Sequence, residues 1–144
     1  MIGILVTGHG NFGSGLTSSL ELIVGKQNHY YAIDFIEGMT TEQLATEYEK
    51  AICEMKSCDG ILVLSDLGGG SPFKTAVICS QGKTNIEVIA GTNLPLLLEA
   101  AMGKDFASDV TLFAQQLITT GKEQVLRFEL ANLKSQQSTS EDGI

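Results

Sequence analysis

One histidine and one aspartate in this sequence stand just beyond two apolar runs, where they could carry chemistry together. His9 follows the run 2–6, and Asp66 follows the run 61–64. A neutral imidazole is a nucleophile near physiological pH. A carboxylate hydrogen-bonded to one ring nitrogen fixes the tautomer, leaves the other nitrogen free to attack, and stabilises the positive ring that forms. A nucleophilic His9 assisted by Asp66 is therefore our first hypothesis.

Three glycines and a serine come directly after Asp66-Leu67 and could hold an anion. The pair Ser71-Pro72 is typical of a helix start, with the serine as N-cap and the proline in the first turn. Backbone N–H groups at such a start can cradle a phosphate, helped by the helix dipole. The candidate phosphate-binding residues are Gly68, Gly69, Gly70 and Ser71. Together with His9 they favour phosphoryl transfer through a phosphohistidine.

These residues must be positioned by an alternation of strands and helices. Short apolar runs predict strands at 2–6, 31–35, 61–64 and 87–90. Helical patterns lie between and after them, at 16–25, 40–55, 71–79, 95–103 and 110–121. Strands alternating with helices imply parallel pairing through right-handed crossovers. We expect an α/β fold with an open, mostly parallel sheet and helices on both faces.

The strand order decides whether the candidate residues meet. In a flavodoxin-like order 2-1-3-4, the first and third strands are neighbours, and ligands bind beyond the carboxyl ends of the strands. His9 and Asp66 would then lie side by side at one edge of the sheet.

The end of the chain differs from the rest. Residues 125–130 alternate apolar and polar side chains, which predicts a fifth strand that is one-faced and antiparallel or at an edge. Residues 135–143 include no large apolar side chain, and we expect 134–144 to be a disordered tail.

Length and charge limit the classes of function. The chain has 144 residues, which fits one domain, and its 9 basic and 17 acidic residues give a net charge of −8. Such an acidic surface excludes a general nucleic-acid binder and favours docking to a basic partner. The sequence shows no basic leader region and no apolar run of membrane-spanning length. Three cysteines cannot all pair, which favours the reducing cytoplasm.

Less specific interpretations stay open. A histidine after a strand is usually an ordinary surface or core residue, Asp66 could cap a turn, and the glycines could form only a flexible loop. His29 lies in a polar loop and is expected to be solvated. No metal site is expected, because the cysteines lack metal-ligand spacing. The three cysteines are Cys53, Cys58 and Cys79. No cofactor or nucleotide is expected either.

Four stretches carry a resemblance to a known family, the IIA component of the mannose-family sugar phosphotransferase system. They read V-T-G-H-G at 6–10, I-D-F-I-E-G at 33–38, D-L-G-G-G-S-P-F at 66–73 and V-I-A-G-T-N-L-P at 88–95. The resemblance implies a IIA domain over residues 1–133. It also implies that His9 is the phosphorylated histidine, that Asp66 hydrogen-bonds it, and that Ser71 and the preceding glycines contact the phosphate.

The resemblance further implies partners. IIA takes phosphate from the histidine-phosphorylated carrier HPr and passes it to a IIB component, which serves the membrane subunits IIC and IID during sugar uptake. The implied chain is cytoplasmic, peripherally associated with the transporter, and a homodimer that exchanges its fifth antiparallel strand, which matches 125–130. Leu67 departs from the pattern, because some relatives carry threonine there.

Two other functions remain possible. One is the phosphoryl-donor subunit of a dihydroxyacetone kinase, which resembles this family near its histidine. The S-P-F after the glycines and the V-I-A-G-T-N-L-P block favour sugar transport over it. The other is a regulatory module whose phosphorylation state is sensed by a transcription regulator. Transfer of label to a IIB protein would separate a carrier from such a module.

Overall fold

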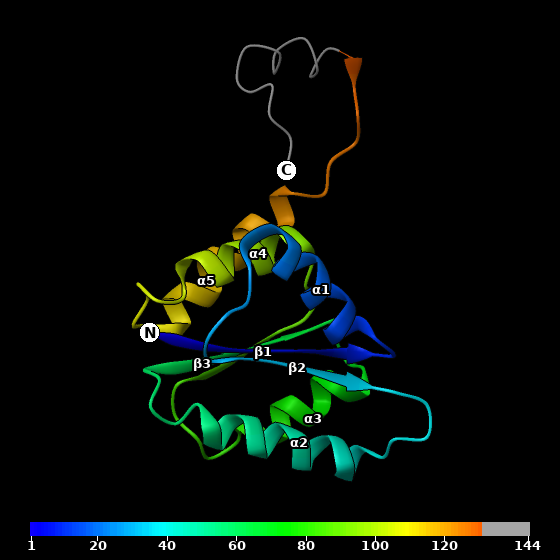
Figure 1. Ribbon diagram of the computed structural model, residues 1–144, viewed down its shortest axis with the longest axis vertical. Coiled ribbons are helices and arrows are strands. Elements are labelled where there is room, and N and C mark those ends of the chain that lie inside the picture. Colours follow the sequence, from blue (N-terminus) through cyan, green and yellow to red (C-terminus); the bar gives the residue numbers. More distant parts are fainter. Residues whose placement is uncertain (131–144) are drawn as a thin grey trace.

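A single parallel sheet forms the centre of the molecule (Figure 1). The computed structural model describes residues 1–130. Within them the strands are β1 (Ile2–His9), β2 (Tyr30–Phe35), β3 (Gly60–Ser65) and β4 (Ile86–Ile89). They run in the order β2-β1-β3-β4, and every pairing is parallel. This order confirms the predicted topology.

Helices cover both faces of the sheet, as expected. They are α1 (Phe12–Val24), α2 (Thr41–Glu54), α3 (Ser71–Ser80), α4 (Leu94–Gly103) and α5 (Val110–Glu123). Figure 1 shows α1, α4 and α5 on one side of the sheet, and α2 and α3 on the other. The molecule is therefore a three-layer α/β sandwich, the class predicted from the alternation of strands and helices.

The two central strands are apolar because both of their faces are buried. On β1, Ile4 and Val6 pack into the core under α1, α4 and α5, whereas Leu5 packs into the core under α2 and α3. Side chains along a strand alternate between its two faces. It follows that Thr7 and His9, which continue the Leu5 series, lie on the α2/α3 side of the sheet.

The helix starts show one capping box and one correction. At α2 a capping box is present: the Thr40 hydroxyl accepts from the Gln43 N–H at 3.1 Å, and the Gln43 side chain accepts from the Thr40 N–H at 2.9 Å. The prediction that Ser71 is the N-cap of α3 is wrong. The helix begins at Ser71 itself, Gly70 occupies the N-cap position, and the cap has no side-chain hydrogen bond.

The last helix runs beyond the glycine at which we expected it to end. Gly121 lies inside α5 and is buried. A Cβ there would come within 2.9 Å of Leu96 Cδ1 in α4. This glycine therefore serves close packing between two helices and does not end α5.

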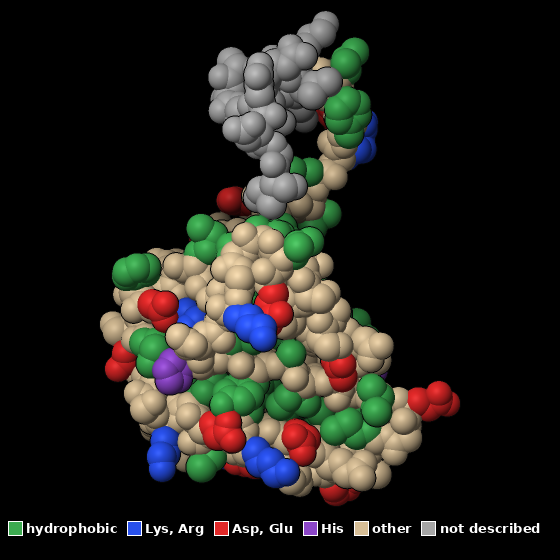
Figure 2. Space-filling model, viewed as in Figure 1, with side chains coloured by type: hydrophobic (Ala, Val, Ile, Leu, Met, Phe, Trp, Pro, Cys, Tyr) green, Lys and Arg blue, Asp and Glu red, His purple; other side chains and the backbone are tan. Residues whose placement is uncertain are grey.

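The expected fifth strand is not formed within the single chain. Residues 125–129 take no regular secondary structure, and Leu126 and Phe128 are 76% and 72% exposed. Figure 2 shows apolar side chains on the segment that leads from the body of the molecule to the grey residues. Exchange of this segment in a dimer stays a prediction, and the predicted disordered tail, 134–144, lies outside the described residues. Within residues 1–130, no helix has both the length and the apolar composition to cross a membrane.

Candidate active site

The carboxyl ends of β1 and β3 bring His9 and Asp66 together. Thr7 of β1 lies opposite Ser65 of β3 in the parallel register. His9 is the last residue of β1, and Asp66 directly follows β3. The ring nitrogen Nδ1 of His9 lies 2.8 Å from Asp66 Oδ2. The juxtaposition predicted from the sequence is therefore present in the structure.

Asp66 is held as an ionised carboxylate. Burial by itself raises the pKa of Asp66, but hydrogen bonds from the His9 backbone N–H, the His9 ring and the Leu67 N–H bring that pKa below its ordinary value. The His9 N–H donates to Oδ2 at 2.8 Å, and the Leu67 N–H donates to Oδ1 at 2.6 Å. An ionised carboxylate can only accept, so Nδ1 of His9 carries the proton. In the neutral imidazole, the Nε2 lone pair of His9 is then free.

The side chain of His9 is accessible, although its orientation is fixed. It is 47% exposed, against 17% for Asp66. The ring of Phe35, at the end of β2, packs edge-on against the imidazole with centroids 6.1 Å apart. A nucleophile of this kind can be reached by a large donor without movement of the sheet.

Gly8 is required by the close approach of Asp66. A Cβ at this position would lie 2.8 Å from Asp66 Cγ and 2.6 Å from Phe12 Cδ1. Glycine before the histidine therefore permits the contact between the two candidate residues.

The glycine turn lies against the other side of the imidazole. A Cβ on Gly70 would lie 2.7 Å from His9 Cε1 and 3.4 Å from His9 Nε2. Gly69 has a φ of 81°, a conformation that favours glycine. Of the predicted phosphate-binding residues, Gly70 therefore lies next to the imidazole.

The donors at this turn differ in part from those expected. The Gly70 N–H closes the turn onto the Leu67 carbonyl at 3.1 Å, so it is already engaged. The N–H groups of Ser71 and Phe73 lie in the first turn of α3, where a helix supplies no acceptor. Phe73 was missed in the sequence, although Pro72 before it marks the start of a helix. These donors and the positive end of α3 favour an anion at the start of this helix.

Asp34 is a second residue that the sequence reasoning missed. Its Oδ1 accepts from the Ser14 N–H at 2.8 Å, and its Oδ2 accepts from the Ser14 hydroxyl at 2.5 Å. Asn11, the N-cap of α1, makes no side-chain cap, so a carboxylate from β2 satisfies this helix start instead. Asp34 thereby anchors the turn that follows His9. Its position at the end of a strand on the same sheet edge was the available signal.

A family profile matches almost the whole body of this chain. The profile, described as the fructose IIA component of the phosphotransferase system (PTS), covers residues 3–118. The chain belongs to this family of PTS IIA components. The matched range includes His9, Asp66 and the glycine turn. The resemblance found in the sequence motifs is confirmed.

Individual relatives agree with this family. The mannose-specific EIIAB component of Escherichia coli K12 is 33% identical over 124 residues, which are 86% of this chain but only 38% of that protein. The chain thus spans less than half the length of this relative. The fructose-specific EIIA component of Bacillus subtilis is 29% identical over 148 residues, with 99% of both chains covered.

Solved structures of IIA proteins share the fold. EIIA from Streptococcus agalactiae has a TM-score of 0.82 at 35% identity, covering 89% of this chain and 98% of that chain. The mannose/sorbose specific IIA subunit from Enterococcus faecalis has a TM-score of 0.80 at 23% identity, covering 89% and 95%. At 23% identity, the similarity to the Enterococcus faecalis subunit shows only that the fold is shared.

His29, Cys58 and Cys79 of this IIA chain lie away from His9. His29 precedes β2, and its carbonyl accepts from the Ile4 N–H at the amino end of the sheet. Burial raises the pKa of the Cys58 and Cys79 thiols above the usual range, so little of either is thiolate. In residues 1–130, no three metal-ligating side chains of the His, Cys, Asp and Glu types come together.

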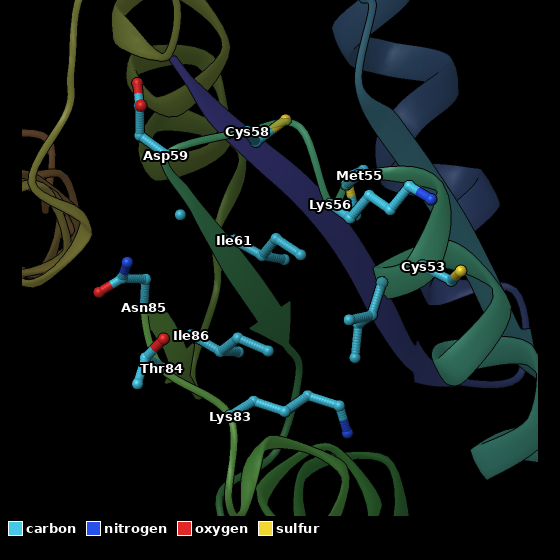
Figure 3. Close-up of a pocket in the computed structure, with 12 residues that line it drawn as sticks. Cys53, Met55, Lys56, Cys58, Asp59, Ile61, Lys83, Thr84, Asn85 and Ile86 are labelled. Carbon is cyan, nitrogen blue, oxygen red and sulfur yellow. The ribbon is translucent and has the colours of Figure 1, made fainter.

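A separate cavity of about 350 Å³ lies at the amino ends of β3 and β4 (Figure 3). Residues at the end of α2, such as Cys53 and Lys56, and Lys83 after α3 line it. Lys83 is already paired with Glu49 at 3.0 Å. The cavity lies at the amino ends of the strands, whereas His9 lies at the carboxyl end of β1. It is therefore not part of the candidate site of the IIA chain.

Proposed function

We propose that the chain is a phosphoryl carrier in which His9 accepts phosphate from phospho-HPr and passes it to a IIB component for sugar uptake. The observation that carries this proposal is the 2.8 Å contact between His9 Nδ1 and Asp66, which in the neutral ring keeps the proton on Nδ1 and leaves Nε2 free beside Gly70, at the start of α3. The IIA family supports it, because its members are PTS components.

The proposed step is an in-line displacement on phosphorus. The Nε2 lone pair of His9 attacks the phosphoryl group on the HPr histidine, and a new nitrogen–phosphorus bond forms as the donor's nitrogen–phosphorus bond breaks. The bonding electrons return to the donor's ring nitrogen. A nucleophile on IIB then takes the phosphoryl group, and His9 regains its lone pair.

Charges of the protein complement each stage of this step. Phosphorylation at Nε2 with the proton kept on Nδ1 makes the ring cationic, and the Asp66 carboxylate lies at hydrogen-bond distance to stabilise it. The Ser71 and Phe73 N–H groups and the dipole of α3 favour the phosphoryl oxygens. The Ser71 hydroxyl, which caps no helix, is available as a further donor.

Apolar side chains beside His9 fit a docking surface for HPr and IIB. Leu67, directly after Asp66, is 61% exposed, and Ile36, directly after Phe35, is 54% exposed. Both belong to the same sheet edge as His9. The net charge of −8 complements a basic partner. In this proposal the chain is cytoplasmic and associates peripherally with the transporter. It supplies the membrane subunits IIC and IID indirectly, through IIB.

The proposed active form is a homodimer that exchanges residues 125–130 as a fifth strand. β4 is a terminal strand of the sheet, so among residues 1–130 one of its edges has no pairing partner. An apolar cavity of about 310 Å³ lies beside it, lined by residues of β4, α4 and α5 and by Val125. An antiparallel strand from the partner would cover this edge, and the exposed apolar side chains of residues 125–130 would be buried.

The test is phosphorylation of the purified chain with phosphoenolpyruvate, enzyme I and HPr. The wild type and His29→Ala should each gain one acid-labile phosphoryl group by mass spectrometry, whereas His9→Ala should gain none. Phosphorus NMR should assign the group to Nε2, and addition of IIB should remove it. A His9→Ala variant that still gains the group, or a wild type that never does, would contradict the proposal.

A further inference from the structure

A tyrosine beneath the candidate site links two of the elements that form it. Tyr48, in the middle of α2, is 1% exposed. Its hydroxyl lies 2.7 Å from the Thr7 hydroxyl and donates to the Pro72 carbonyl at 3.2 Å. Because the Tyr48 proton is directed to Pro72, the Thr7 hydroxyl donates to the Tyr48 oxygen. One chain of two hydrogen bonds thus runs from β1 through α2 to α3.

Both ends of this chain lie next to the candidate active residues. Thr7 is two residues before His9 on β1, and the two side chains are on the same face of the strand. Pro72 directly follows Ser71, the first residue of α3, whose turn flanks the His9 ring. The Tyr48 hydroxyl therefore joins the strand that bears the nucleophile to the helix start beside it.

The environment makes this link stiff. Burial raises the pKa of Tyr48 far above its usual range, although the hydrogen bond with Thr7 opposes this, so the phenol stays protonated and keeps donating. Thr7 is also fully buried. If the Tyr48 hydroxyl were lost, the Thr7 hydroxyl would be left in an apolar layer without this partner, and such a loss is costly.

We propose that Tyr48 is a positioning residue for phosphoryl transfer, whose hydroxyl sets the spacing between His9 Nε2 and the amino end of α3. The inference rests on the proposed function. Tyr48 itself touches neither the ring nor the phosphate site. It acts through Thr7 and Pro72, because a small change in the alignment of reacting groups slows transfer strongly.

The experiment compares Tyr48→Phe with a matched control, Tyr30→Phe. Tyr30 also shares a hydrogen bond with a threonine hydroxyl, Thr17 at 2.6 Å, and burial raises its pKa to about 12. It lies at the amino end of β2, away from His9. For each variant we would measure kcat and KM with phospho-HPr, the melting temperature, and the NMR signal of His9 Cε1–H.

We expect Tyr48→Phe to lower kcat about tenfold, with KM unchanged, because the exposed surface around His9 is not altered. The His9 Cε1–H signal should shift, since this atom lies against Gly70. Tyr30→Phe should change neither readout, even with a similar loss in melting temperature. If Tyr48→Phe does not fold, Thr7→Val, which breaks the same chain at its other end, takes its place.

Three outcomes would overturn the inference: kcat within twofold of wild type with an unmoved His9 signal, equal losses of kcat in both tyrosine variants, or a rise in KM alone. The double variant Tyr48→Phe/Thr7→Val should be no slower than the slower single variant, and additive losses would also contradict a shared link. If the wild type is never phosphorylated, the proposed function fails. A His9 signal that still shifts only in Tyr48→Phe would then support the positioning role alone.

Discussion

One carboxylate oxygen of Asp66 holds both the backbone and the ring of His9. Oδ2 accepts from the His9 N–H and from His9 Nδ1, each at 2.8 Å. The other oxygen, Oδ1, accepts from the Leu67 N–H. Three donors therefore fix one carboxylate, and the carboxylate in turn fixes the tautomer and the direction of the imidazole.

The substitution Asp66→Asn should leave the fold intact and slow transfer on the order of 10²-fold. The amide oxygen can still accept from an N–H, but a neutral group does not stabilise a cationic ring. Stopped-flow or quench measurements with HPr and with IIB would show the loss. Rates equal to wild type with both partners would mean that Asp66 only shapes the turn.

Acid should weaken the fold partly through Asp66. Its pKa in the folded chain is below the ordinary value of 3.8, so its contribution to the free energy of unfolding is fully present well above that value. The contribution shrinks as the pH falls below 3.8 and is lost once the pH passes the folded pKa. Urea unfolding of wild type and Asp66→Asn should give a smaller difference near pH 3 than at about pH 5, where Asp66 is ionised and the histidine charge no longer changes. If the difference in free energy of unfolding grew between about pH 5 and pH 3, the pKa of Asp66 would be raised by folding, and the prediction would be wrong.

Gly70→Ala should displace the His9 ring and lower the transfer rate at least tenfold. The new Cβ would lie 2.7 Å from His9 Cε1, which is closer than real contacts allow, although the φ of −73° at Gly70 suits alanine. Gly15→Ala is the control, because a Cβ there meets nothing within 4 Å. Phosphorylation kinetics and circular dichroism would separate a blocked site from a lost fold. Equal rates in both variants would argue against contact between the turn and the ring.

Removal of residues 123–144 should produce an unstable or aggregating chain, whereas removal of 135–144 should be neutral. If the strand is exchanged, the longer deletion leaves the outer edge of β4 uncovered in the dimer and removes Leu126, Phe128 and Leu130. Burial of each of these side chains in a dimer would contribute about 2 kcal/mol to the free energy of association. The conformational entropy lost when residues 125–130 become ordered offsets part of this. Light scattering decides the matter. A stable, active monomer after the longer deletion would exclude the exchanged strand.

The sheet and the pairing of His9 with Asp66 could be predicted because they follow from general rules. Buried parallel strands are uniformly apolar, and the order of the strands places the residues that follow β1 and β3 at one edge. No contact had to be known in advance. The same reasoning found the glycine turn, since three consecutive glycines rarely stand inside a helix or strand.

Contacts between distant elements could not be predicted in the same way. Asp34 caps α1 from β2, and Tyr48 connects β1 with α3, and neither leaves a periodic signal in the sequence. Ser71 was assigned as a cap because serine before proline is common there, but the turn places Gly70 at that position. Gly121 was assigned as the end of a helix because its packing against Leu96 is invisible in the sequence.

The central place of β1 has a consequence for the chain as it is synthesised. β1 is synthesised before both of its partners, because one of its edges pairs with β2 and the other with β3, which begins only at Gly60. Its apolar side chains stay uncovered until more than two further elements have emerged. Parallel pairing between strands far apart in the sequence forms late, and the intermediates that precede it expose apolar surface and are prone to aggregate. Nascent chains that end before β3 are therefore expected to be chaperone clients.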